Sequence, residues 1–370
     1  MMRVHFCVLN LLLAAIIAAM GAMPLESQEP AATRISINGP GNLAIDNDGH
    51  LFVLETEENT VRRIDLRKGT IATIAGNGKK CCYKEGVKAT QVSLRFLFAL
   101  ATDSFGNIFI GENYRILKVD ASTGLISTVA GAAEAGNTID GVSAQSAHFW
   151  NIDGLAVDKD ENLYVADGRQ RKVFRIDANS GVVHHYAGSG RPGHGGATES
   201  ANAANFELAT GAITIDNWGN LIVADYGNCR VNWIDRANRV LETVTVTGGV
   251  EDNCAVDWPD PTRSGPYPSH PASDSAGNIY FVADGKVFRV DAKTSVVSIF
   301  AGTGATGFSG DKGLASNARF SAPSGLAIDA AGNVYIADFV TNRVRRVDAK
   351  TGIITTVAGN GLPHRVDIIL

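Results

Sequence analysis

The chain repeats itself six times, and this repetition constrains its fold more than any other feature. The segment SGLAIDAAGNVYIADFVTNRVRRVDAKTGIITTVAGNG near the C-terminus has counterparts throughout the chain from residue 40 onward. An aspartate closes the third apolar run of each copy, at Asp65, Asp120, Asp177, Asp235, Asp291 and Asp348. The intervals between these aspartates are 55, 57, 58, 56 and 57 residues. Such even spacing indicates an array of equivalent structural units.

Each copy contains four short apolar runs, which predict four β-strands, a to d. In the last copy they are GLAID, NVYIAD, RVRRVD and IITTVAG. Turns rich in Gly and Asn, such as Gly106-Asn107, separate strands a and b, and these residues favour tight hairpins. Four-stranded antiparallel units arranged around an axis form a β-propeller, which protects its sheet edges. We therefore predict an all-β fold, a six-bladed β-propeller of four-stranded antiparallel blades.

The start of the chain predicts export. Arg3 precedes an apolar run over residues 6–20, interrupted only by Asn10; this pattern is typical of a secretory signal peptide and is short for a membrane-spanning helix. We expect a signal peptide over 1–23, a linker over 24–33 and the propeller over 34–370; a retained signal anchor is the alternative. The blades are predicted near residues 40–76, 97–131, 152–188, 210–248, 268–302 and 323–359. Residues 33–37 or 365–370 could add a strand that closes the ring.

Two copies carry a resemblance to a known family. GLAID…GNVYIAD…NRVRRVD in the last copy and GLAVD…NLYVADGRQRKVFRID in the third resemble NHL repeats, over about nine tenths of the mature chain. The resemblance implies the propeller fold and, with the leader, an exported, bacterial-type member. NHL propellers include ligand-binding, protein-binding, RNA-binding and enzymatic proteins, so the family does not specify a function.

The charge of the chain disfavours nucleic acid as a partner. The net charge is −5 and the isoelectric point is near 5.9, which leaves no positive excess to neutralise a phosphate backbone. We expect a monomer that is secreted or periplasmic and has no membrane span once the signal peptide is removed.

Loop lengths predict the binding face. The b–c turns and the d–a connections between blades lie on one side of a propeller, here called the loop-rich face, and the d–a connections are roughly 17 to 25 residues long, far beyond usual connections. We predict that this face binds a protein, peptide or glycan, and that aromatic and charged residues contribute. Packing within the loops is the alternative role for each of these candidates: Tyr83, Lys84, Tyr114, Arg169, Arg191, Tyr226, Asp257, Trp258 and Phe308.

A charged row recurs at the ends of strands b and is interpreted as scaffold. Its acidic members are Glu55, Glu112, Asp167, Asp225, Asp284 and Asp338. We expect them to pair with a basic row formed by Arg115, Lys172, Arg230, Lys286 and Arg343. What recurs in every blade serves the fold, whereas what differs between blades is available for a ligand.

Three residues depart from the repeat near one mouth of the central channel. Asn42, Asp153 and His270 stand where other copies mostly hold Gly, Ala or Ser. These residue types could hold a divalent metal ion, which would support a propeller lyase, lactonase or hydrolase. The alternative is a solvated, hydrogen-bonded channel mouth. The DNDGH segment at residues 46–50 lacks the later Glu of a calcium loop and is predicted to be a hairpin turn.

Four cysteines remain after the predicted leader: Cys81, Cys82, Cys229 and Cys254. Cys229 and Cys254 fall on the same predicted face, and an exported protein can oxidise them, so we predict a Cys229–Cys254 disulfide. A bond between the adjacent Cys81 and Cys82 would be strained, because neighbouring Cα atoms are closer together than disulfides prefer.

Overall fold

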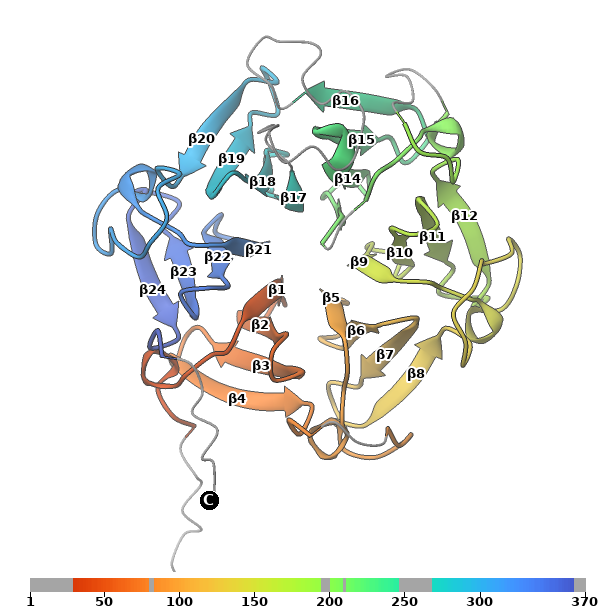
Figure 1. Ribbon diagram of the computed structural model, residues 1–370, viewed down its shortest axis with the longest axis horizontal. Coiled ribbons are helices and arrows are strands. Elements are labelled where there is room, and N and C mark those ends of the chain that lie inside the picture. Colours follow the sequence, from red (N-terminus) through yellow and green to blue (C-terminus); the bar gives the residue numbers. More distant parts are fainter. Residues whose placement is uncertain (1–28, 80–82, 194–199, 209–210, 246–267, 363–370) are drawn as a thin grey trace, which may run out of the picture. The chain divides into compact units, whose positions relative to one another are not determined.

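The computed structural model contains a six-bladed β-propeller (Figure 1). It describes residues 29–79, 83–193, 200–208, 211–245 and 268–362. In this part of the chain, 24 strands form six four-stranded antiparallel sheets, and each sheet consists of four consecutive strands. The predicted fold class is confirmed. The propeller belongs to one compact unit, Ala31–Leu370, which is distinct from Met1–Pro30.

The blades are numbered one to six in chain order, and their strands a to d run from the central axis outward (Figure 1). The strands of blades one to three are β1 (Pro40–Ile45), β2 (His50–Glu55), β3 (Thr60–Asp65), β4 (Thr70–Ala75), β5 (Leu97–Thr102), β6 (Ile108–Glu112), β7 (Arg115–Val119), β8 (Ile126–Ala130), β9 (Ile152–Val157), β10 (Leu163–Asp167), β11 (Lys172–Ile176) and β12 (Val183–Ala187). Those of blades four to six are β13 (Ile213–Ile215), β14 (Leu221–Asp225), β15 (Arg230–Ile234), β16 (Leu241–Thr245), β17 (Ser269–Ser273), β18 (Ile279–Ala283), β19 (Lys286–Val290), β20 (Val297–Ala301), β21 (Pro323–Ile328), β22 (Val334–Asp338), β23 (Arg343–Val347) and β24 (Ile354–Ala358).

The hydrophobic core lies between neighbouring blades. Every residue of β10, LYVAD, and of β14, LIVAD, is buried, because adjacent blades cover both faces of these second strands. The apolar clusters each join two blades; between blades two and three, for example, the rings of Phe149 and Phe174 meet edge to face at 5.9 Å. This arrangement explains why strand b is nearly continuous in apolar residues, whereas the outer strand β20 buries only one of its five residues, Ala301.

The long d–a connections dock onto the outer edge of the next blade instead of lying only on the loop-rich face. Antiparallel bridges such as Ser143 to Val182 and Leu314 to Ile353 add a short fifth segment beside strand d, which covers that edge. Short 3-10 helices follow these bridges or begin the propeller: η1 (Ala32–Arg34), η2 (Ala89–Gln91), η3 (Ala144–Ser146), η4 (Ala201–Ala203) and η6 (Ala315–Asn317); η5 (Tyr226–Asn228) lies in a b–c turn. No helix in the described ranges has the length and apolar character needed to cross a bilayer.

The second half of each d–a connection therefore belongs to the scaffold. A buried alanine begins the 3-10 helix, and a buried apolar residue follows five positions later, as in Ala144 with Phe149 and Ala315 with Phe320. From their length, these connections were predicted to belong to the binding face. Their docking restricts the variable part to the first half of each connection.

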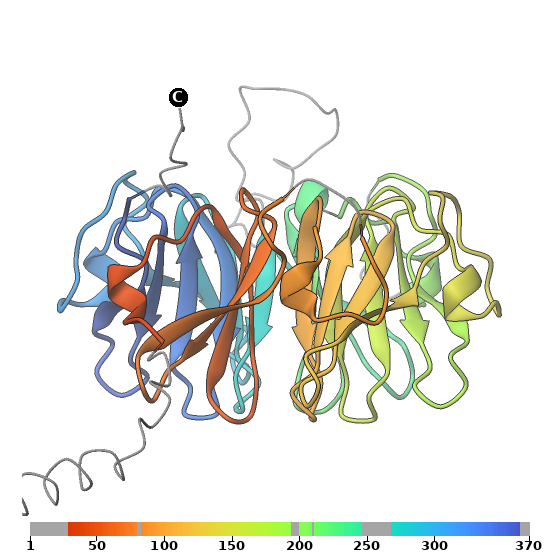
Figure 2. The same cartoon turned by 90° about the horizontal axis from the view of Figure 1, so that it is seen from below.

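The ring closes through the segment that precedes β1. The N–H of Ala32 donates to the carbonyl of Gly69 (2.8 Å), and the N–H of Gly359 donates to the carbonyl of Ala32 (3.0 Å). Ala144 makes the same two bonds at the junction of blades two and three. Blades one and six also share an apolar cluster. Figure 2 shows η1 docked against the outer edge beside β4, as the other 3-10 helices dock in their blades.

Closure thus uses a docked segment and no exchanged strand in the described part of the chain. Residues 33–37, considered above as an added strand, contain most of η1 and form no strand. Residues 365–370 lie outside the described residues.

Candidate binding face and channel mouth

The acidic row at the ends of strands b holds the loop-rich face in place. Asp167 accepts a hydrogen bond from the backbone N–H of Trp150 (2.7 Å), and Glu112 accepts one from the N–H of Arg95 (2.8 Å). The same bond joins a backbone N–H before the first strand to Glu55, Asp225 and Asp338. Because these carboxylates are committed to the backbone, the scaffold interpretation fits five of the six acidic residues.

The expected basic partners contribute unevenly. Arg115 forms an ion pair with Glu112, and Arg230 forms one with Asp225 (2.8 Å). Arg343 instead donates to the carbonyls of Thr341 and Asn360.

The b–c turns present side chains that differ from blade to blade. The predicted residues Tyr114, Arg169 and Tyr226 occupy these turns in blades two, three and four, and Arg169 is exposed. Blade six places Phe339 and Val340 there, and Val340 is 61% exposed. The turns therefore combine a constant acidic base with variable side chains.

Sequence reasoning missed Phe96, which is 64% exposed directly before β5. Its carbonyl accepts the N–H of Asn113, as that of Gly39 accepts the N–H of Thr56 in blade one. Phe96 adopts a φ of 49°, where Gly39 has 58°. Alignment of the copies places Phe96 opposite Gly39 of blade one. A bulky residue at a position that elsewhere holds glycine is the signal by which the sequence could have revealed Phe96.

Three cation–aromatic stacks tie the connections to the blades. The guanidinium of Arg115 lies 4.0 Å from the ring centre of Tyr83, and that of Arg343 lies 3.8 Å from Phe308. Arg169 lies 4.2 Å from the ring of Trp150. These contacts give Tyr83 and Phe308 a packing role within the loops, although Phe308 stays partly exposed. Lys84 and Arg191 are exposed.

Asp153 and His270, which the sequence predicts near the channel mouth, both contact Gly211. The N–H of Gly211 donates to the backbone carbonyl of Asp153. A Cβ atom at Gly211 would lie only 2.1 Å from Cδ2 of His270, and Gly211 has a φ of +72°. Glycine is therefore required at this position, beside the ring of His270. Asn42 lies in β1, where its Cα is close to Gly325 of blade six; its part in a metal site stays a prediction.

Burial shifts both ionisable groups toward their neutral forms. Asp153 accepts hydrogen bonds from Asn151 (2.6 Å) and from the N–H of Gly168 (2.7 Å), yet burial, reinforced by the charge of Asp167, raises its pKa to about 7. Burial lowers the pKa of His270 to about 4, and its Nδ1 has no hydrogen-bond partner within the described ranges. At neutral pH the imidazole of His270 is therefore neutral, and the carboxyl group of Asp153 is near its titration midpoint.

The DNDGH segment has the hydrogen bonds of a turn. Asp46, Asp48 and His50 offer ligand atoms within 4.8 Å of one another. However, Oδ1 of Asp46 accepts the N–H groups of Asp48 and His50, as Asp103 and Asp329 do in equivalent hairpins. The recurrence supports the hairpin interpretation.

Several predicted residues fall outside the described part of the chain. These are Asp257, Trp258, Cys81, Cys82 and Cys254, together with the predicted signal peptide. Cys229 is buried at the end of η5, and its pairing with Cys254 stays a prediction.

Comparison with known proteins adds to this picture. The family model for the teneurin NHL domain matches residues 293–365, which include all of blade six. Protein SUPPRESSOR OF QUENCHING 1 of Arabidopsis thaliana is 24% identical over 86% of this chain, and Teneurin-4 of Mus musculus is 25% identical over 80%. NHL repeat-containing protein 2 of Bos taurus is 24% identical over 72% of this chain. The chain is an NHL-repeat β-propeller.

The relationship of this NHL-repeat propeller to these proteins is distant and partial. The chain spans 26%, 10% and 40% of their respective lengths. Among solved structures, that of streptogramin B lyase gives a TM-score of 0.52 at 15% identity, covering 89% of this chain and 85% of the lyase. The nidogen/laminin complex gives 0.53 at 12% identity, covering 82% of this chain and 91% of the matched chain. These similarities show a shared fold alone.

Proposed function

We propose that this NHL-repeat propeller is an exported, non-catalytic binding scaffold that holds a protein, peptide or glycan on its loop-rich face. One observation carries the proposal. The hydrogen bonds that build this face recur from blade to blade, whereas the exposed side chains above them do not. A scaffold of this kind can change its ligand contacts without losing its fold.

The chemistry of the variable side chains fits an interaction surface. Phe96 and Val340 expose large apolar groups, and Arg169 presents its charge over the ring of Trp150. Aromatic and arginine side chains are enriched among the residues that dominate binding energy. A propeller of the same fold is present in the nidogen/laminin complex, which supports protein binding by analogy.

A double variant tests the face. Phe96→Gly installs the residue found at the matching position of blade one, and Arg169→Ala removes the cation; neither change touches the buried acidic row. Wild type and variant would be screened against a glycan array and a displayed peptide library. The control is Phe105→Ser, because Phe105 is exposed in an a–b turn on the opposite face.

The expected result is selective binding by the wild type that the double variant loses and the control keeps. Binding that survives in the double variant, or that disappears equally in the control, would contradict a role for the loop-rich face.

The proposed export has its own measurement. Peptide mapping of the secreted protein without reduction is expected to show a Cys229–Cys254 cross-link and an N-terminus near residue 24. A free Cys229 thiol with an intact leader would point to an unprocessed protein.

A second candidate function is a lyase, lactonase or hydrolase centred on the channel mouth. Asp153 and His270 favour it, because environments that shift the pKa values of two titratable groups suit acid–base chemistry. Asn42, Asp153 and His270 are the proposed metal ligands. Elemental analysis of the purified propeller tests this version: a stoichiometric divalent ion lost in His270→Ala supports it, and a folded protein without metal contradicts it.

A further inference from the structure

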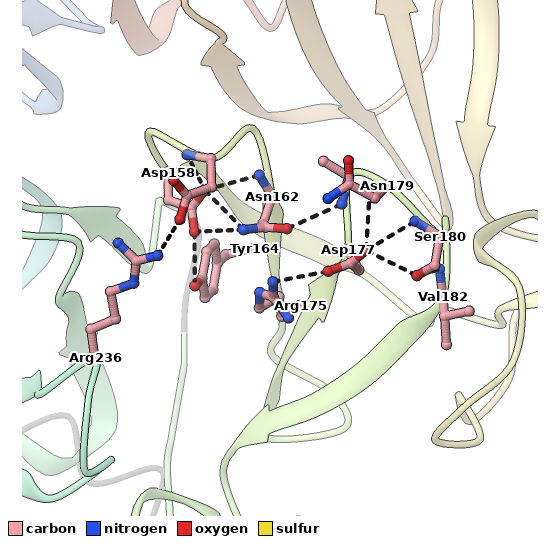
Figure 3. A network of polar contacts seen from close by, with 11 residues as sticks. Asp158, Asn162, Tyr164, Arg175, Asp177, Asn179, Ser180, Val182 and Arg236 are labelled. Carbon is pink, nitrogen blue, oxygen red and sulfur yellow. Dashed lines mark hydrogen bonds and ion pairs between the residues drawn. The ribbon is translucent and has the colours of Figure 1, made fainter.

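A cavity lies between blades three and four, away from the loop-rich face. It has a volume of about 480 Å³ and is lined from blade three by the a–b turn and strand β12, and from blade four by the c–d turn. Tyr164, His184 and Tyr186 contribute from the first side, and Arg236 and Arg239 from the second. Figure 3 shows the polar network on one wall, in which Tyr164 donates to Asp158 and Arg236 reaches toward the same turn.

The lining residues depart from the repeat at several positions together. Arg239 occupies a position at which four other blades have glycine: Gly69, Gly124, Gly181 and Gly352. Arg236 stands where the counterparts are Ala121, Ala178, Ala292 and Ala349. Strand β12 has His184 and Tyr186 where the last blade has Thr355 and Val357. Residues that recur in every blade serve the fold, whereas residues that differ between blades are available for a ligand. The residues that line this cavity belong to the second group.

The backbone at Arg239 gives this departure a cost. Arg239 has a φ of 57°, a conformation that glycine adopts freely and that other residues adopt at an energetic penalty. The repeat offers a less strained solution at the same place in four blades. A requirement of the fold therefore does not explain the arginine.

Three arginines and two aspartates line the cavity: Arg175, Arg236 and Arg239, with Asp140 and Asp158. Arg175 pairs with Asp177 (3.1 Å), and Arg236 pairs with Asp160. Arg239 stacks on Tyr186 at 4.4 Å and donates to Asn202 (2.8 Å) and to the carbonyl of Tyr186, but it has no ion-pair partner in the described part of the chain. Among the three arginines of the cavity, Arg239 is therefore the one that is held in position without an ion pair in the described residues.

We propose that this cavity binds a small anionic sugar, either a sugar phosphate or a sugar acid. The anionic group would meet Arg239, whose planar guanidinium suits phosphate and carboxylate geometry. His184 and Asn202, which are exposed at the cavity, provide hydrogen-bonding groups for sugar hydroxyls. The site lies on another face from the proposed scaffold surface and does not depend on it.

Variants that restore the repeat test the proposal without disturbing the fold. Arg239→Gly and Arg236→Ala each install the residue that four other blades have. Ser295→Gly is the matched control, because Ser295 has the same place in blade five and a φ of 55°. Binding of glucose 6-phosphate, glucuronate, inorganic phosphate and glucose would be measured by calorimetry on the propeller.

We expect at least one anionic sugar to bind and neutral glucose not to bind. Arg239→Gly is expected to weaken binding by about tenfold or more, since a charge-assisted hydrogen bond is lost, whereas Ser295→Gly retains it. Glucose 6-phosphate alone would identify a phosphate ligand, and glucuronate alone a carboxylate ligand. No binding by either sugar, equal binding by Arg239→Gly, or inorganic phosphate binding as tightly as the sugars would overturn the proposal.

Discussion

Asp153 differs from the other aspartates of the propeller because burial outweighs its hydrogen bonds. It is 5% exposed, and its pKa rises to about 7. Asp120, which is partly exposed in a c–d turn, accepts bonds from Ser122 and Thr123 that lower its pKa to about 2. The contributions of these two aspartates to the stability of the propeller therefore change with pH in opposite directions.

The variant Asp153→Asn tests this difference. The folded pKa of Asp153 lies above its unfolded value of 3.8, so its favourable contribution is fully present below that value and is lost as pH rises toward 7. The variant should gain stability over wild type between pH 4 and pH 7, by on the order of 3 kcal/mol, with no further gain above pH 8. Urea unfolding across this range measures it.

Asp120→Asn serves as the control of opposite sign. Because the pKa of Asp120 is lowered, its contribution is present above pH 4 and is lost as pH falls toward 2. A stability difference for Asp153→Asn that does not change with pH would show that the carboxyl group is ionised in the folded protein.

The residue scale is also where sequence reasoning reached least far. It selected Asp153 and His270 as departures from the repeat, but their common contact with Gly211 depends on how neighbouring blades approach each other. Phe96 escaped notice because a phenylalanine before a strand appears to be core until its positive φ is known. Tyr83 and Phe308 were selected for their aromatic character, and their contacts with arginines became visible only in three dimensions.

At the scale of the element, the end of strand d depends on a recurring close approach. Gly188 has a φ of +91°, and a Cβ atom there would lie 2.2 Å from the carbonyl oxygen of Arg171. Gly76, Gly131 and Gly359 have the same arrangement. The absent side chain lets the outer strand end against the b–c turn of its own blade.

Gly188→Ala should therefore destabilise the propeller by about 3 kcal/mol or more, because backbone strain and a clash with a carbonyl act together. Gly181→Ala is the matched control in the same blade: its φ is +66°, but nothing lies within 4 Å of the added atom, so about 1 kcal/mol is expected. Chemical denaturation measures both. Equal losses would mean that φ alone sets the cost.

Strands and hairpins were predictable because the six copies share the same pattern of apolar residues and the same turn residues. The docking of the d–a connections was not, although Ala144 and Phe149 have counterparts at the same spacing in other blades. Alignment of the copies ended at the strands, and the lengths of the connections vary enough to hide the match. The cavity around Arg239 lies between blades three and four, so it could not be predicted from the sequence of a single copy.

At the scale of the whole molecule, stability depends on the contact that joins the last blade to the first. Ala32 is completely buried and makes both backbone hydrogen bonds of the closing junction. Thr33, the next residue, is exposed. The apolar cluster shared by blades one and six adds to this junction.

Ala32→Glu should open the ring, because a buried carboxylate has neither room nor a partner there. We expect a loss of about 3 kcal/mol and faster proteolysis of blades one and six, whereas Thr33→Glu should leave both unchanged. Thermal unfolding and limited proteolysis measure the two effects. An unchanged melting temperature in Ala32→Glu would show that the segment before β1 contributes nothing to closure.

The closing junction uses the same two backbone bonds as the junctions through which the chain runs without interruption. The ring therefore does not depend on which of the connections between blades contains the two ends of the chain. A circularly permuted chain, with residue 362 linked to residue 31 and new termini in another connection, would keep every blade and every interface. Such a permutant would place the ends of the chain between any chosen pair of blades, while the binding face and the cavity between blades three and four keep their structure.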